Sequence, residues 1–262
     1  MLAQNLPSLT RLSNSTDVLF LLIGAVMIFS MHAGFAFLEA GSVRRRSQVN
    51  AFNKIIFEWA ISTVMYFVVG YPIARGVNFW LNASALNGHS LDMVRFFLYL
   101  GFAACVPAII SGGVAERAKF WTNTLAGAVF VGLAYPVLEA CCWGQFSGRV
   151  FSGDGSWLAS WAGHGFHDYA GSVVVHSMGG WLALPAVLLM GPRRRRYAED
   201  GTSQPIQVSS IPFLSLGSWI LCAGWFGFNV MSAGAVNDIS ALVAVNSLMA
   251  MVGGTIAAML LS

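Results

Sequence analysis

The sequence predicts an all-α membrane protein, a polytopic bundle with seven transmembrane helices in this chain. Of its 262 residues, 56% are hydrophobic and 10% are charged, whereas about a quarter of the residues in a soluble domain are charged. Seven separate stretches are apolar over about 20 residues, the length that a helix needs to cross the hydrocarbon core. Arginine and lysine gather in the short segments between these stretches, as they do beside membrane spans.

The predicted spans cover residues 18–40, 52–72, 94–114, 122–143, 170–191, 211–231 and 239–261. Arginine and lysine are enriched on the inner side of a membrane, which decides between the two orientations. With the N-terminus outside, the inner segments hold Arg44, Arg45, Arg46, Lys54, Arg117, Lys119 and Arg193 to Arg196, and the outer segments hold Arg11, Arg75, Arg95 and Arg149. Ten against four favours this orientation, in a plasma or inner membrane. The polar inner segment 197–210 is the natural boundary in the chain.

Several classes of function are not indicated. The four cysteines lie in apolar stretches without metal-ligand spacing, so we expect buried hydrophobic side chains and no disulfides. His164 and His167 lie close together in an outer loop, but no third ligand is near, so no metal or other cofactor is expected. No enzyme motif occurs, and the arginine run indicates an inner face against anionic lipid rather than a nucleic-acid site. Residues 1–17 lack the pattern of a cleavable signal peptide.

The first and third predicted spans carry acidic side chains at their inner ends. Glu39 is expected in a structural ion pair, and the adjacent Glu116 and Arg117 are expected to tie helix ends together. His32 lies deeper, where a lone histidine is more often a packing residue than a ligand. The first span also has small residues that let a neighbouring helix approach closely, at positions 33, 34, 36, 40 and 41.

The fifth predicted span begins at Asp168 and carries His176 eight residues further on. In an α-helix His176 would lie ~12 Å deeper than Asp168 and be turned by roughly 80°. An ionisable group at such depth is costly and is a candidate for function. The alternative is that Asp168 caps the first turn and His176 bonds to a neighbouring helix.

Estimated depths bring two phenylalanines to the same level as His176. Phe102 and His176 would lie about 12 and 9 Å below the outer ends of their spans, and Phe228 would lie near the outer end of the sixth. Such an aromatic constriction above one histidine suits a small, weakly polar permeant. The alternative is coincidence, because the chain has 19 phenylalanines. The mouth above this level would hold Trp143, Asp168 and Ser232.

Four segments of the sequence resemble the ammonium transporter family (Amt/Mep/Rh), in that family's order: residues 34–44, 115–117, 166–176 and 224–229. The resemblance runs through nearly the whole chain. It implies an ammonium transporter fold of eleven helices in two inverted halves, assembled as a homotrimer with one pore in each subunit. Residues 1–191 would form the first five-helix half, and residues 211–262 would begin the second.

The resemblance also implies roles for individual residues. Trp143 and Ser232 look like an outer recruitment site for ammonium, with Asp168 in support, and Phe102 and Phe228 look like a stacked gate. His176 looks like the first of two pore histidines. Trp225 and Asn229, in the segment 224–229, are assigned to the pore, and Asn229 is expected to bond the backbone of a neighbouring helix.

The chain also departs from the family pattern. Met231 lies where many relatives carry small residues, so a narrower mouth is expected, and Glu139 lies where the family varies. The sequence predicts seven spans where the family has eleven, and it lacks the family's second pore histidine. The expectation is therefore that residues 1–262 belong to a longer protein and do not conduct alone.

The predicted function is transmembrane movement of ammonium or ammonia, with no enzymatic activity. One alternative is an ammonium sensor that uses the same fold to signal through an attached domain. Another is an Rh-like channel for ammonia gas. Expected partners are membrane lipid, two further copies of the chain and a cytoplasmic regulatory protein.

Overall fold

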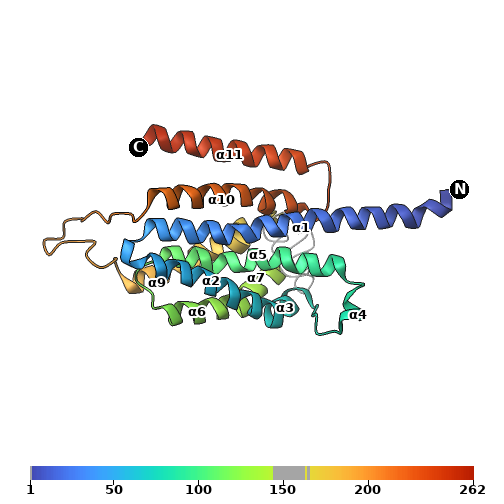
Figure 1. The fold of residues 1–262 in the computed structure, drawn as a ribbon, viewed down its shortest axis with the longest axis horizontal. Helices are drawn as coiled ribbons and strands as arrows, with labels where there is room; N and C mark the ends of the chain where they lie inside the picture. The colour runs from blue at the N-terminus through green and yellow to red at the C-terminus, as the bar shows by residue number, and fades with distance from the viewer. Residues whose placement is uncertain (1, 144–162, 164–165) are drawn as a thin grey trace.

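The computed structural model describes residues 2–143, 163 and 166–262, and over these residues the chain is almost entirely helical (Figure 1). An isolated β-bridge joins Tyr197 and Ser203 in the loop between the fifth and sixth spans. Seven described segments are long and apolar enough to cross a membrane, which confirms the predicted fold class. They are Asn14–Ser42, Arg45–Arg75, Ser90–Gly113, Phe120–Cys142, Ser172–Met190, Ile211–Ala233 and Ser240–Leu261.

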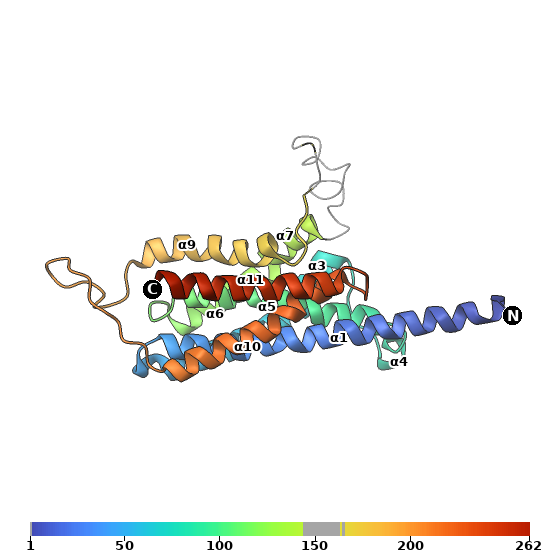
Figure 2. The same ribbon diagram turned by 90° about the horizontal axis from the view of Figure 1, so that it is seen from above.

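Three helices form the centre of the bundle: α1 (Leu2–Ser42), α5 (Ser90–Gly113) and α10 (Ile211–Val230). Figure 1 and Figure 2 show α10 beside α1, and the N-terminal part of α1 projecting beyond the other helices. The final helix, α11 (Ser240–Leu261), packs against α10, and almost all of its side chains are exposed. These exposed apolar side chains suit contact with lipid or with further protein.

The second and fourth spans each contain a π-helical turn. The second span consists of a short 3₁₀ turn (Arg45–Ser47), α2 (Gln48–Met65), the π turn Tyr66–Gly70 and α3 (Tyr71–Arg75). The fourth consists of α6 (Phe120–Val129), the π turn Phe130–Ala134 and α7 (Tyr135–Cys142). Pro72 and Pro136 lie just after the π turns. Because proline lacks an N–H and clashes with the carbonyl four residues earlier, a widened turn accommodates it.

The fifth span and two short elements complete the described part of the chain. The fifth span starts with the π turn Ser172–Ser177 and continues as α9 (Met178–Met190). A four-residue helix, α4 (Ala83–Leu86), lies between the second and third spans, and a 3₁₀ turn (Met231–Ala233) ends the sixth.

Helices α1 and α10 approach each other closely through glycine. A Cβ atom added at Gly41 would lie 2.6 Å from the backbone N of Leu214, and one added at Gly217 would collide with the backbone of Leu38. Gly34 packs against Leu221 in the same way. The close approach predicted for the small residues of the first span is therefore present at Gly34 and Gly41, and its partner is the sixth span.

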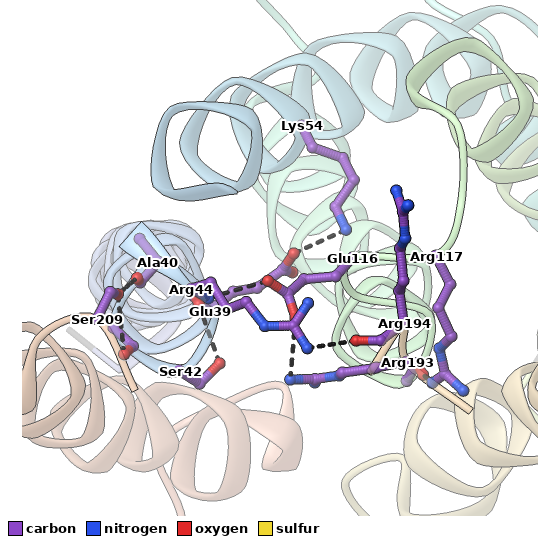
Figure 3. Close-up of polar contacts among 12 residues, drawn as sticks. Glu39, Ala40, Ser42, Arg44, Lys54, Glu116, Arg117, Arg193, Arg194 and Ser209 are labelled. Atoms are coloured by element: carbon purple, nitrogen blue, oxygen red, sulfur yellow. Dashed lines mark hydrogen bonds and ion pairs between the residues drawn. The ribbon is translucent and has the colours of Figure 1, made fainter. Parts of the chain in front are cut away.

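Polar contacts join the spans at the arginine-rich end of the bundle (Figure 3). Lys54 Nζ lies 2.7 Å from Glu39 Oε1, and the Ser111 hydroxyl donates to the other carboxylate oxygen. Both charged side chains of this pair are almost fully buried. The structural ion pair expected for Glu39 is therefore confirmed, and it joins α1, α2 and α5.

The turn after α5 holds two further chain segments in place (Figure 3). Glu116 Oε1 accepts from the Arg44 backbone N–H at 3.0 Å, and Arg193 Nη1 lies 3.8 Å from Oε2. Arg117 Nη1 donates to Gly191 O at 2.7 Å. Glu116 and Arg117 therefore tie helix ends together, as predicted.

Candidate functional site

A cavity of about 300 Å³ lies among the ends of the fourth and sixth spans, away from the arginine-rich loop. We call it the mouth cavity, and its lining includes Tyr99, Phe102, Trp143, Asp168, Met231 and Ser232. The three residues predicted at the mouth are thus together in one cavity. Tyr169 also lines it, and burial raises the pKa of its hydroxyl above the usual value, so this group stays neutral.

Asp168 caps the start of the fifth span. Its Oδ1 accepts from the backbone N–H groups of Gly171 and Ser172, both at 2.9 Å. Its Oδ2 accepts from those of Val173 and Val174, at 2.9 and 2.8 Å. Four N–H groups at a helix start lack partners within the helix, so one carboxylate satisfies this end and complements its dipole.

The estimate of ~12 Å and roughly 80° between Asp168 and His176 assumes a continuous α-helix, and that assumption is wrong. The helix begins only at Ser172, after Gly171 with φ +86°, a left-handed conformation that favours glycine. Its first turn is π-helical, so the His176 N–H donates to Gly171 O, five residues back. A π turn has more residues per turn, which changes the direction of every side chain that follows.

Trp143 lies at the end of α7 with its indole N–H engaged. Nε1 donates to the Asp168 backbone carbonyl at 2.5 Å, and the ring lies 5.8 Å from that of Phe102. The indole N–H is therefore held by the backbone that precedes the fifth span.

Ser232 lies in the 3₁₀ turn that ends the sixth span, and its hydroxyl donates to Phe228 O at 2.5 Å. A hydroxyl has one proton and two lone pairs. Because the proton is used within the helix, the oxygen is left to accept from a donor in the mouth cavity.

Phe102 lines the mouth cavity, and Phe228 packs against the Phe102 ring. Their ring centroids lie 4.3 Å apart. The rings are tilted by 45°, whereas the family resemblance implies a stacked pair. Phe102 is 2% exposed and Phe228 is fully buried. The two rings therefore form a close, buried aromatic pair.

His176 lies on the far side of Phe228. Its ring lies 5.3 Å from that of Phe228 and stacks on Trp225 at 5.4 Å with an interplanar angle of 12°. Phe102 contacts Phe228, and the rings of Phe228, His176 and Trp225 contact one another, with the Trp225 ring 6.3 Å from that of Phe228. The structure brings these four predicted residues together below the mouth.

Asn229 is not part of this group of rings. It lines a groove between α10 and α11, together with Trp225 and Ser247. Its Nδ2 donates to Ser247 Oγ at 2.8 Å, so the predicted bond to a neighbouring backbone is wrong. Successive residues of an α-helix differ by about 100° in direction, so Asn229 and Phe228 cannot face the same side.

Sequence reasoning missed some of the residues around the mouth. Tyr99 precedes Phe102 by one helical turn, a spacing that could have placed it on the same face. Arg75, counted only as an outer charge, donates to the backbone carbonyl of Trp143 at 2.9 Å. Met231, predicted to narrow the mouth, does line it and fills the space left by the missing side chain of Gly24.

The described residues contain no group of three or more potential metal ligands. His167 lines the mouth cavity, and His164 lies outside the described residues.

The sequence pattern of the Ammonium Transporter Family matches residues 19–262. Over 265 residues the chain is 38% identical to the ammonium transporter Amt2 of Methanocaldococcus jannaschii, with 97% of this chain and 59% of that protein covered. It is 34% identical to Amt2 of Archaeoglobus fulgidus, with 93% and 53% covered. The chain thus spans just over half the length of these relatives.

Two solved structures have similar folds. One is a sensor Amt protein, with a TM-score of 0.83 and 29% identity over 96% of this chain and 63% of that one. The other is Candida albicans Mep2, with a TM-score of 0.69 and 21% identity over 86% of this chain and 50% of that one.

Proposed function

The chain belongs to the ammonium transporter family, and from this membership we propose that the protein moves ammonium or ammonia across a membrane. The observation that carries the proposal is the Phe102–Phe228 pair, with ring centroids 4.3 Å apart between the mouth cavity and His176. A narrow aromatic neck followed by one imidazole suits a permeant that is small and can give up a proton.

In this proposal Trp143, Ser232 and Asp168 form the recruitment site. The Trp143 ring attracts a cation by about 1–2 kcal/mol where water is excluded, and the Ser232 oxygen accepts a hydrogen bond from it. Asp168 acts indirectly, because its carboxylate already accepts four backbone hydrogen bonds and its carbonyl holds the indole N–H.

Phe102 and Phe228 act as the gate. An isolated charge in an apolar environment costs many kcal/mol, so the ammonium ion gives up its proton near the neck. His176, supported by the Trp225 ring at 5.4 Å, takes part in passing that proton on. Asn229 belongs to the pore wall only indirectly, because it anchors α11 to α10 through Ser247.

The test uses the protein from its complete reading frame, purified into liposomes. An inward gradient of labelled methylammonium should drive its uptake. Trp143→Leu should raise the apparent KM for methylammonium about tenfold, a loss of roughly 1.4 kcal/mol in binding. Sodium gradients serve as the control. Equal, slow uptake with and without the protein would overturn the proposal.

An ammonium sensor is a second candidate function, because the structural neighbour with a TM-score of 0.83 is a sensor Amt protein. The same mouth would then bind ammonium and report its occupancy to an attached domain. Saturable binding of ammonium without flux would favour the sensor. Flux without any electrical current would favour the Rh-like channel for ammonia gas.

The orientation of the chain in the membrane, its division into two halves and its partners are also proposals. We place the N-terminus outside a plasma or inner membrane, residues 1–191 in one half of the fold and residues 211–262 in the other. The exposed apolar sides of α9 and α11 suit a homotrimer and lipid. A cytoplasmic regulatory protein would meet the arginine-rich end.

A further inference from the structure

Arg75 and Glu139 form a buried ion pair beside the mouth cavity. Arg75 ends α3, and Glu139 lies in α7, four residues before Trp143. The π turns that precede these two helices lie against each other and set their register. The Glu139 side chain is fully buried, and that of Arg75 is 17% exposed. Because burying two charges costs free energy that their attraction often fails to recover, stability alone does not explain the pair.

All three nitrogens of the Arg75 guanidinium group donate hydrogen bonds, and one of its faces packs on an aromatic ring. Nε and Nη2 lie 3.0 and 2.8 Å from Glu139 Oε1, and the Tyr66 hydroxyl donates to Glu139 Oε2 at 2.6 Å. Nη1 donates to Trp143 O at 2.9 Å. The Tyr99 ring centroid lies 4.0 Å from Cζ, within the range of a cation–π contact.

Two of these partners, Trp143 and Tyr99, line the mouth cavity. The Trp143 backbone is held on both sides, because its N–H donates to Glu139 O at 2.7 Å and its carbonyl accepts from Arg75. Its indole N–H is held separately by the Asp168 carbonyl. The ion pair and the aromatic wall of the mouth are therefore one connected structure.

We infer that Arg75 is a positioning residue for substrate recruitment: it holds Trp143 and Tyr99 in place at the mouth, while Glu139 neutralises its charge. This inference rests on the function proposed above for the mouth cavity. Neutralisation matters because an uncompensated guanidinium at this place would repel an ammonium ion. The planar guanidinium group of arginine matters because it can contact a carboxylate, a carbonyl and an aromatic ring at the same time.

Two variants separate positioning from charge. Arg75→Met/Glu139→Gln leaves no unpaired charge, and the amide oxygen that it introduces can still accept from the Tyr66 hydroxyl, so the protein should fold. Arg75→Lys keeps the ion pair, but a single ammonium group cannot replace the whole guanidinium group. The matched control is Lys54→Met/Glu39→Gln, which removes the other buried ion pair, at the arginine-rich end.

The kinetic readout is methylammonium uptake by the full-length protein in liposomes. Both Arg75 variants should raise the apparent KM about five- to tenfold and leave the maximal rate within about twofold, because a misplaced binding group weakens recruitment rather than passage. The control should lower the amount of folded protein without changing the apparent KM.

A second readout does not depend on transport. The protein is labelled with 5-fluorotryptophan, and the ¹⁹F resonance of Trp143 is assigned by its loss in Trp143→Phe. This resonance should shift or broaden in both Arg75 variants and stay unchanged in the control. An unchanged KM together with an unmoved resonance in Arg75→Met/Glu139→Gln would overturn the inference. Failure of the proposed function would look different: the unchanged protein would neither carry nor bind ammonium, which would also overturn the substrate role inferred for Arg75.

Discussion

The carboxylate of Asp168 lies at the proposed binding site, but backbone hydrogen bonds occupy both of its oxygens. It accepts four backbone hydrogen bonds, from Gly171, Ser172, Val173 and Val174. These bonds leave its oxygens little capacity to bind a cation directly. Its part at the mouth is to start the fifth span and, through its carbonyl, to orient the Trp143 indole.

We predict different outcomes for Asp168→Asn and Asp168→Ala. Asparagine keeps one acceptor oxygen and should allow part of the protein to assemble, whereas alanine leaves four N–H groups without a partner, at about 1–3 kcal/mol each where they are buried. The measurement is the yield of assembled protein by size-exclusion chromatography. Equal, undiminished assembly of both variants would contradict an architectural role.

A second prediction concerns His176, whose ring packs against the Phe228 and Trp225 rings. His176→Ala should abolish or strongly alter ammonium movement while assembly remains intact, because the proposed proton transfer needs the imidazole, whereas the fifth span also packs against α5. His89→Ala is the matched control, since His89 is exposed and lies between the second and third spans. Uptake equal to that of the unchanged protein in His176→Ala would exclude a relay through this residue.

Among the elements, α1 and α10 have the tightest packing that glycine provides. Gly217 lies against the backbone of Leu38, where no Cβ atom fits. Such contacts let two membrane helices gain dispersion energy along their whole length, which matters because lipid removes the hydrophobic drive for association.

We predict that Gly217→Ala destabilises the protein by about 1–3 kcal/mol, the usual cost of overpacking. Gly180→Ala is the matched control, because a Cβ atom at Gly180 in α9 would meet nothing within 4 Å. The measurement is the temperature at which detergent-solubilised protein loses its folded elution peak. Equal temperatures for the two variants would show that the α1–α10 contact can relax.

At the scale of the whole molecule, the polar contacts drawn in Figure 3 lie at the arginine-rich end of the bundle, and the mouth cavity opens at the other end. Ser209 at the end of the inter-span loop donates to the Ala40 carbonyl, and Arg44 Nη2 donates to Arg194 O at 2.6 Å. The loop between the fifth and sixth spans is thereby fastened to the end of the first. The segment at the predicted boundary between the two halves is therefore held in place at both ends.

The predicted orientation can be tested with single cysteines in a variant whose four native cysteines are replaced. A membrane-impermeant thiol reagent should label Asn87→Cys in intact cells, and Glu199→Cys only after permeabilisation. Both positions are outside the predicted spans and accessible to solvent at least in part, so the difference reports the side of the membrane and not burial. The opposite labelling pattern would place the arginine-rich end outside and reverse the proposed topology.

The number of spans, their approximate ends and the ion pair at Glu39 could be predicted from the sequence. Apolar length and the positions of charges are local properties, which any fold of this chain must respect. The family could also be recognised from short segments, and with it the residues around the mouth, whose roles remain proposals. The capping role of Asp168 was open as an alternative, because an acid before an apolar run favours a helix start.

Only the tertiary structure decided what lies between the spans. Arg75 and Glu139 are 64 residues apart, and neither residue alone indicates the other. The π turns redirect the side chains that follow them, so the continuous α-helix assumed between Asp168 and His176 is wrong. Asn229 likewise bonds a side chain of α11 rather than a backbone. The physical reason is the same in each case: apolar length determines that a helix crosses the membrane, whereas its rotation and register depend on the surfaces against which it packs.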